Sequence, residues 1–135
     1  MDRMMHKILQ PPGWPRPKGY SNGVSASGRM IFTAGVIGWD ENEMIVSDRL
    51  DQQFAQVLRN IVAILAEDGA GPEHIVRITA YVTDIDAYRA SLAEVGAAWR
   101  EIIGRNYPAM ALVAVTSLVE PQVLVEIEAT AVVPD

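Results

Sequence analysis

The chain has 135 residues, half of them hydrophobic, and a formal net charge of −6 at pH 7. This length and composition predict one globular domain over residues 1–135. No cysteine is present, which excludes disulfides, thiolate metal sites and cysteine nucleophiles. The start of the chain lacks the apolar run and cleavage site of a secretory signal, and no apolar run is as long as a membrane span. We therefore expect a cytoplasmic protein that does not insert into membranes.

The charged residues narrow the class of ligand. His6 and His74 are too few for a three-histidine metal site, and no metal-binding motif accompanies the carboxylates, so we predict no metal. The excess of acidic residues disfavours binding to phosphate backbones, and no cluster of lysine or arginine reverses it locally. We expect a small-molecule ligand rather than nucleic acid, with one or two arginines sufficient for an anionic group.

The first half of the chain is expected to form three strands and a helix. Residues 1–18 make a proline-rich N-terminal segment that should be extended and non-helical. The strands are predicted over residues 20–27, 30–34 and 44–46. An apolar stripe at helical spacing then predicts a helix, capped by Ser47 or Asp48 and ended by Gly69.

The second half predicts a strand, a helix and two more strands. Residues 74–83 alternate with period two, so the apolar residues from Val76 to Val82 should share one buried face. A second helix should follow, capped by Asp84 or Asp86. The last strands are predicted over residues 110–118 and 122–133. The order βββαβαββ predicts an α+β fold with both helices on one face of the sheet.

The last two strands are largely apolar on both faces, which bears on assembly. Two helices cover one face of a sheet, so the other face should expose a continuous apolar patch, which usually marks an association surface. We therefore expect a closed homo-oligomer. In the alternative, loops or the N-terminal segment cover this face in a monomer, but that segment is short. We also expect the association surface to wall the ligand site.

Two glutamates on the final strand are the first candidates for chemistry. Glu126 and Glu128 lie two residues apart and therefore point to the same face. Glu128 fits an ordinary polar surface. Glu126 has apolar neighbours, so it should be paired with a cation or shifted in pKa, and such a carboxylate can transfer a proton or position a water. A structural ion pair is the alternative. The sequence has no nucleophilic triad, P-loop or dinucleotide motif.

Five short motifs, in order and spacing, resemble the YjgF/RidA family, also called L-PSP endoribonuclease-like or translation-inhibitor proteins. They are Gly19-Tyr20-Ser21, Phe32-Thr-Ala-Gly-Val-Ile37, Tyr81-Val-Thr-Asp84, Tyr107-Pro-Ala109 and Val125-Glu-Ile-Glu-Ala129. The resemblance runs from about Gly19 to Val132. It implies a chorismate-mutase-like α+β fold, a homotrimer with ligand clefts between subunits, and hydrolysis of reactive enamines or imines. It also implies that no cofactor is needed.

Part of the family's site is retained in this sequence. Tyr20, Gly35 and Glu126 match family positions, and Glu126 corresponds to the glutamate thought to position the attacking water. The resemblance therefore implies catalytic roles for Glu126 and Tyr20, with Gly35 in the binding site.

Other positions depart from the family pattern. The arginine that binds the substrate carboxylate is replaced by Met110, and three polar positions are replaced by Ala34, Val36 and Leu92. A methionine supplies neither the charge nor the orientation of a bidentate arginine. Further residues expected to line the pocket are Trp39 and Leu112. Arg16, Lys18 or Arg105 would then have to supply a cation.

These features predict a small-metabolite protein, with hydrolytic deamination of a non-standard enamine or imine as the reaction. The alternative is a non-catalytic ligand-binding or regulatory trimer in which Met110 and Leu112 form apolar walls. Endoribonuclease activity comes third, because the acidic charge and the lack of a histidine-based site argue against it.

Overall fold

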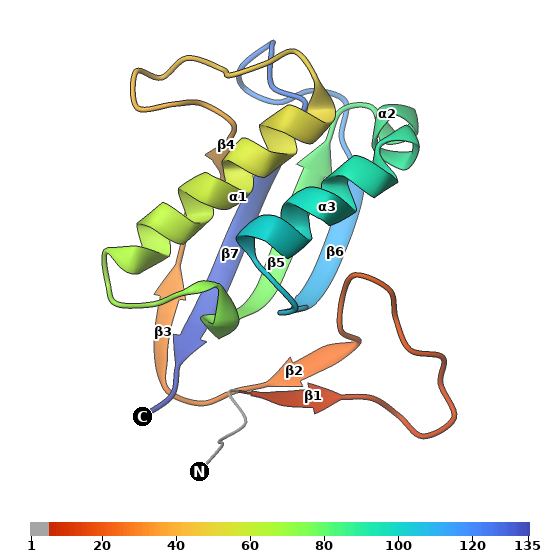
Figure 1. Cartoon of the computed structure of the whole chain (residues 1–135), viewed down its shortest axis with the longest axis vertical. Helices are drawn as coiled ribbons and strands as arrows, with labels where there is room; N and C mark the ends of the chain where they lie inside the picture. Colours follow the sequence, from red (N-terminus) through yellow and green to blue (C-terminus); the bar gives the residue numbers. More distant parts are fainter. Residues whose placement is uncertain (1–5) are drawn as a thin grey trace.

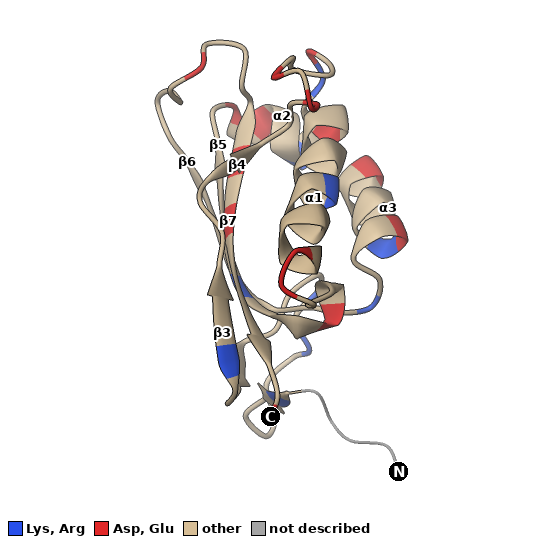
Figure 2. Ribbon diagram, turned by 90° about the vertical axis from the view of Figure 1, so that its left-hand side faces the viewer, with Lys and Arg blue, Asp and Glu red and all other residues tan. Residues whose placement is uncertain are grey.

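A mixed five-stranded sheet with helices on one of its faces forms the body of the protein (Figures 1 and 2). The computed structural model describes residues 6–135. The strand order is β3–β7–β5–β6, and β4 also pairs with β7. The strands span Arg29–Phe32 (β3), Val36–Ile37 (β4), Ile75–Val82 (β5), Ala109–Ala114 (β6) and Val125–Val133 (β7). The predicted α+β fold is therefore confirmed.

Helices fill one side of this sheet. They are α1 (Leu50–Ala66), α2 (Ile85–Ala90), α3 (Leu92–Ile102) and the short 3-10 helix η1 (Pro72–His74). Strand β5 runs parallel to β6, because the connection through α2 and α3 crosses over the sheet, and β5 and β7 are antiparallel. Within residues 6–135, no helix is long and apolar enough to cross a membrane.

The helix ends differ from the prediction in two places. Arg49 occupies the N-cap of α1 without a side-chain cap, while Ser47 Oγ accepts the Arg49 N–H at 3.0 Å, so the predicted cap at Ser47 or Asp48 is wrong. Asp84 caps α2 as predicted, through a 3.0 Å bond from the Ala87 N–H. The predicted second helix is two helices, because Ser91 leaves helical geometry between them.

Several strand boundaries also required correction. The predicted first strand shortens to β2 (Gly23–Ser25), which pairs with β1 (Lys7–Leu9) in a separate two-stranded sheet. The predicted strand over residues 44–46 is wrong, since only Ile45 forms an isolated bridge, to Trp39. Strand β6 ends at Ala114 because its partner β5 ends at Val82. Strand β7 begins at Val125, since the preceding residues form a turn.

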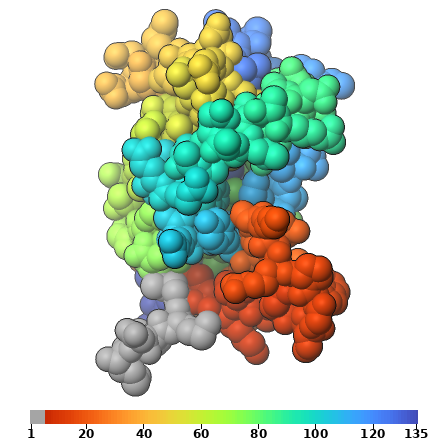
Figure 3. All heavy atoms as spheres, turned by 45° about the vertical axis from the view of Figure 1, so that its right-hand side comes forward, coloured from red at the N-terminus to blue at the C-terminus, as the bar shows by residue number. Residues whose placement is uncertain are grey.

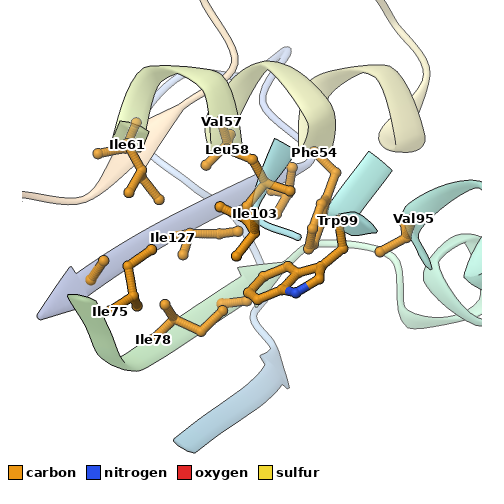
Figure 4. Close-up of a cluster of buried hydrophobic side chains, with 14 of the residues drawn as sticks. Phe54, Val57, Leu58, Ile61, Ile75, Ile78, Val95, Trp99, Ile103 and Ile127 are labelled. Carbon is orange, nitrogen blue, oxygen red and sulfur yellow. The ribbon is translucent and has the colours of Figure 1, made fainter. Parts of the chain in front are cut away.

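The core lies between the sheet and α1 and α3 (Figure 4). Alternate residues of β7 are buried there, as period two requires: Val125, Ile127, Ala129 and Ala131. On β5 the prediction fails at one end. A β-bulge between Ile75 and Arg77 buries Ile75 and leaves Val76 half-buried, so Val76 does not continue the face of Ile78.

One buried polar side chain connects α1 to two loops. Gln53 is fully buried, and its Nε2 donates to the Ser47 carbonyl at 2.8 Å and to the Gln122 carbonyl at 2.9 Å. Its Oε1 accepts the Leu124 N–H at 2.8 Å. Buried polar groups require partners, so Gln53 fixes the turn that leads into β7.

We predict that Gln53→Met lowers the free energy of unfolding by about 2–4 kcal/mol, because it leaves three backbone groups without partners at nearly constant volume. Urea denaturation measures the change. Gln52→Met is the matched control, since Gln52 is an exposed residue of the same helix. Equal stabilities of the two variants would contradict the role of Gln53.

Candidate functional site

In the described part of the chain, no helix covers the face of the sheet opposite α1 and α3 (Figure 2), and large apolar side chains are exposed on it. Phe32 is 66% exposed, Met30 58% and Val113 44%. Polar residues lie between them on β5 and β7, so the predicted continuous apolar patch is interrupted at its centre. A pocket of about 260 Å³ on this face is lined by Phe32, Arg77 and Glu128, among others.

Glu126 lies on this open face, beside the backbone that leads into β4. In the sheet register it is flanked by Ile37 of β4 and Tyr81 of β5. A Cβ atom on Gly35 would collide with Glu126 Oε2, so the carboxylate can lie here only because position 35 is glycine. The three ion pairs formed within residues 6–135 do not include Glu126.

The residues predicted around Glu126 are divided by the fold. Gly35 directly precedes β4 and lies beside the carboxylate, and Ala34 before it is exposed, whereas the Val36 side chain is buried in the core. Trp39 follows β4 and is half-buried. Its carbonyl accepts Asn60 Nδ2 at 2.9 Å, which ties this loop to α1.

A second cluster of predicted residues lines a pocket on the helix side of the sheet. Tyr20, Leu92, Met110 and Leu112 contribute to its walls, and its volume is about 560 Å³. Tyr20 is 41% exposed, so its hydroxyl can reach a ligand. Figure 3 shows the described part of the N-terminal segment beside the chain around residue 100, and both contribute residues to this pocket. We call it the α3–β6 pocket.

The two clusters lie on opposite faces of the same sheet. Met110 pairs in register with Ile78, whose side chain is buried under the helices. Glu126 pairs with Tyr81, and alternation along β7 turns it away from the buried Val125 and Ile127. Within one chain, Met110 and Glu126 therefore belong to different surfaces. The expectation that the association surface also walls the ligand site concerns the oligomer and stays a prediction.

The expected replacement cations lie in neighbouring pockets. Lys18 lines the α3–β6 pocket, while Arg16 and Arg105 line an adjoining pocket of about 820 Å³ that shares Tyr20 with it. Arg100, which also lines the α3–β6 pocket, was not predicted as a site residue from the sequence. Its signal in the sequence was the spacing of Leu92, Gly96 and Arg100, which places them along one edge of a helix.

Comparison with known proteins identifies the family. A family model described as Endoribonuclease L-PSP matches residues 15–133. The chain belongs to this family, which includes the Rid and YjgF proteins. A RutC family protein of Synechocystis is 35% identical over 97% of this chain and 99% of its own length. Another, of Pyrococcus abyssi, is 36% identical over 87% of this chain and 89% of its own.

Solved structures agree with this assignment. The Rid family protein YyfB of Yersinia pestis, whose function is unknown, is 32% identical with a TM-score of 0.85, covering 96% of this chain and all of its own. A YjgF family member from Mycobacterium tuberculosis is 36% identical with a TM-score of 0.65, covering 85% and 87% of the two chains. The Rid fold predicted from the motifs is thus confirmed.

Beside Glu126, this Rid family protein holds a hydrogen-bonded tyrosine and glutamate. Tyr81 Oη donates to Glu128 Oε1 at 2.8 Å. This bond, partial desolvation and the negative charges of Glu128 and Glu126 raise the pKa of Tyr81 above its ordinary value. The phenol therefore stays protonated, and continues to donate, to a higher pH than an ordinary tyrosine.

We predict that Glu128→Gln lowers the pKa of Tyr81 toward the ordinary tyrosine value, because it removes the negative charge of residue 128 and leaves only a neutral amide acceptor. Absorbance titration of tyrosinate measures this, with Tyr81→Phe identifying the contribution of Tyr81. A raised pKa in the folded state also means that stability falls as pH rises through it. Tyr81→Phe should remove that part of the alkaline loss, and an unchanged titration in Glu128→Gln would contradict the coupling.

Proposed function

We propose that this Rid family protein is a homo-oligomer that hydrolyses an enamine or imine in a cleft between two copies. The separation of Glu126 from the α3–β6 pocket carries the proposal. In the described part of one chain, the α3–β6 pocket on the helix side of the sheet contains no carboxylate. Glu126 lies on the opposite face, where the pocket is less than half as large. A second copy placed against this chain would complete the site, as in the trimers that the family resemblance implies.

The proposed reaction uses the retained residues. A water held by Glu126 attacks the carbon of the C=N bond, and the carboxylate accepts a proton from that water. That proton passes to the nitrogen and gives a carbinolamine. The carbon–nitrogen bond then breaks as the carbinolamine hydroxyl gives up its proton, which the carboxylate passes to nitrogen, so nitrogen leaves as ammonia and a keto acid remains. An enamine first tautomerises to the imine, its nitrogen losing a proton and its carbon gaining one. The Tyr20 hydroxyl and the backbone near Gly35 would hold the tetrahedral centre by hydrogen bonds.

We predict that the protein accelerates ammonia release from imines generated in situ by an amino-acid oxidase. Glu126→Gln should reduce that acceleration about 100-fold or more, the usual scale for a general base, while its melting temperature stays near that of the wild type. Glu67→Gln is the control, because Glu67 is exposed at the end of α1. Full acceleration in Glu126→Gln would refute this role.

The open face generates a prediction about assembly. Phe32→Asp places a charge among the exposed apolar side chains of that face, so we expect smaller species in sedimentation equilibrium. Ile64→Asp is the control, since Ile64 is an exposed apolar residue of α1 on the helix side. The proposed cleft also requires ammonia release to fall in Phe32→Asp. An unchanged oligomer, or activity in isolated monomers, would contradict the proposal.

A non-catalytic ligand-binding protein is the second candidate. The observation that favours it is the apolar β6 wall of the pocket, where Met110 stands in place of the family's arginine and Leu112 is also apolar. In that case a keto acid or imine raises the melting temperature through binding, and ammonia release stays at the rate in buffer.

A further inference from the structure

The α3–β6 pocket is built from aromatic rings. The Phe54 and Tyr88 rings lie 6.4 Å apart at 38°, and the Trp99 and Tyr107 rings are stacked at 6.4 Å and 11°. The indole N–H of Trp99 donates to the Asn106 carbonyl at 3.1 Å, so its ring meets the pocket with its polar group already satisfied. All four aromatic side chains line the pocket. Its surface therefore suits an apolar or aromatic group.

The charge of the pocket is of one sign. Among the described residues that line it, Lys18 and Arg100 are cationic and none is acidic. Neither cation takes part in the ion pairs formed within residues 6–135. In a chain with a net charge of −6, two unpaired cations beside an acid-free pocket give a local preference for an anion.

The guanidinium of Arg100 lies close to Gly96. A Cβ atom on Gly96 would lie 3.3 Å from Arg100 Nη1, so the guanidinium lies back over the preceding turn of α3. Glycine inside a helix is unfavourable relative to alanine. At position 96 the absence of a side chain gives the Arg100 guanidinium room to lie along the surface of α3, where it lines the pocket. The β6 wall, with Met110 and Leu112, supplies no charge of its own.

We propose that the α3–β6 pocket binds small carboxylic acids with an aromatic or large apolar side chain. Arg100 and Lys18 hold the carboxylate, and the side chain packs against Trp99 and Tyr88. Combined with the proposed function, on which this step rests, the substrate class is the 2-imino acids with aromatic side chains. The cation of the site then comes from α3 and the N-terminal segment and not from β6.

Three related compounds test the ligand class by isothermal titration calorimetry of the full chain. Phenylpyruvate has both the ring and the carboxylate, phenylacetone has the ring without the carboxylate, and pyruvate has the carboxylate without the ring. We expect phenylpyruvate to bind about tenfold or more tightly than either of the others, the scale of a charge-assisted hydrogen bond. Equal binding of pyruvate or of phenylacetone, or no binding of phenylpyruvate, would overturn the proposal.

Substitutions assign the carboxylate contact. Arg100→Gln combined with Lys18→Gln should weaken phenylpyruvate about tenfold or more and leave phenylacetone unchanged. Arg59→Gln combined with Lys7→Gln is the matched control, because both residues are exposed, line none of the three pockets described above and together remove the same two charges. Wild-type affinity for phenylpyruvate in the double variant would refute the assignment.

Binding and turnover separate this inference from the proposed reaction. If phenylpyruvate binds in the charge-dependent way described and no imine is hydrolysed faster than in buffer, the proposed reaction fails and the ligand class stands. If small imines are hydrolysed as fast as aromatic ones and phenylpyruvate does not bind, the ligand class fails and the reaction stands.

Discussion

The alternation of residues along β7 is the constraint on which the rest of the structure depends. This strand pairs with β3, β4 and β5, so each of its side chains is committed to one face of the sheet. The residues that face the helices are Val125, Ile127, Ala129 and Ala131, and they complete the core under α1. The same alternation necessarily sends Glu126 and Glu128 outward. A shift of one residue would bury two carboxylates, so core packing holds Glu126 on the open face.

Local patterns in the sequence were enough for the fold class and most elements. The apolar stripe of α1 and the alternation of β7 each need only their own residues to be recognised. The strand β1 was missed because it has three exposed residues, and only its pairing with β2 makes it a strand. The break at Ser91 was missed because the apolar stripe runs through it without interruption, and the decisive signal is the backbone geometry of one residue.

The candidate site shows a different limit. Glu126 and Met110 were both recognised in the sequence, yet their faces depend on strand register. Met110 lies toward the helices because it pairs with Ile78, a long-range contact that no local pattern specifies. Arg100 was missed for a related reason. Its role depends on a pocket whose other wall comes from β6, a strand distant in the sequence. The candidate residues could thus be picked from the sequence. Which of them lie together on one face could be known only from the strand register of the sheet.

Moving the cation from a strand to a helix surface changes what such a site can select. An arginine at position 110 would project from the sheet, where pairing with β5 fixes its backbone. Arg100 instead reaches the pocket with a long, exposed side chain that lies over Gly96. An exposed cation is screened by water and salt, so it contributes less orientation than a bidentate contact from a rigid strand. In the proposed site, discrimination between ligands therefore depends more on the Trp99 and Tyr88 rings that pack against the ligand side chain than on the carboxylate. A site that relies mainly on ring contacts favours substrates that differ in their side chains. In the proposed oligomer, Glu126 of a second copy then acts on the C=N bond that these substrates share.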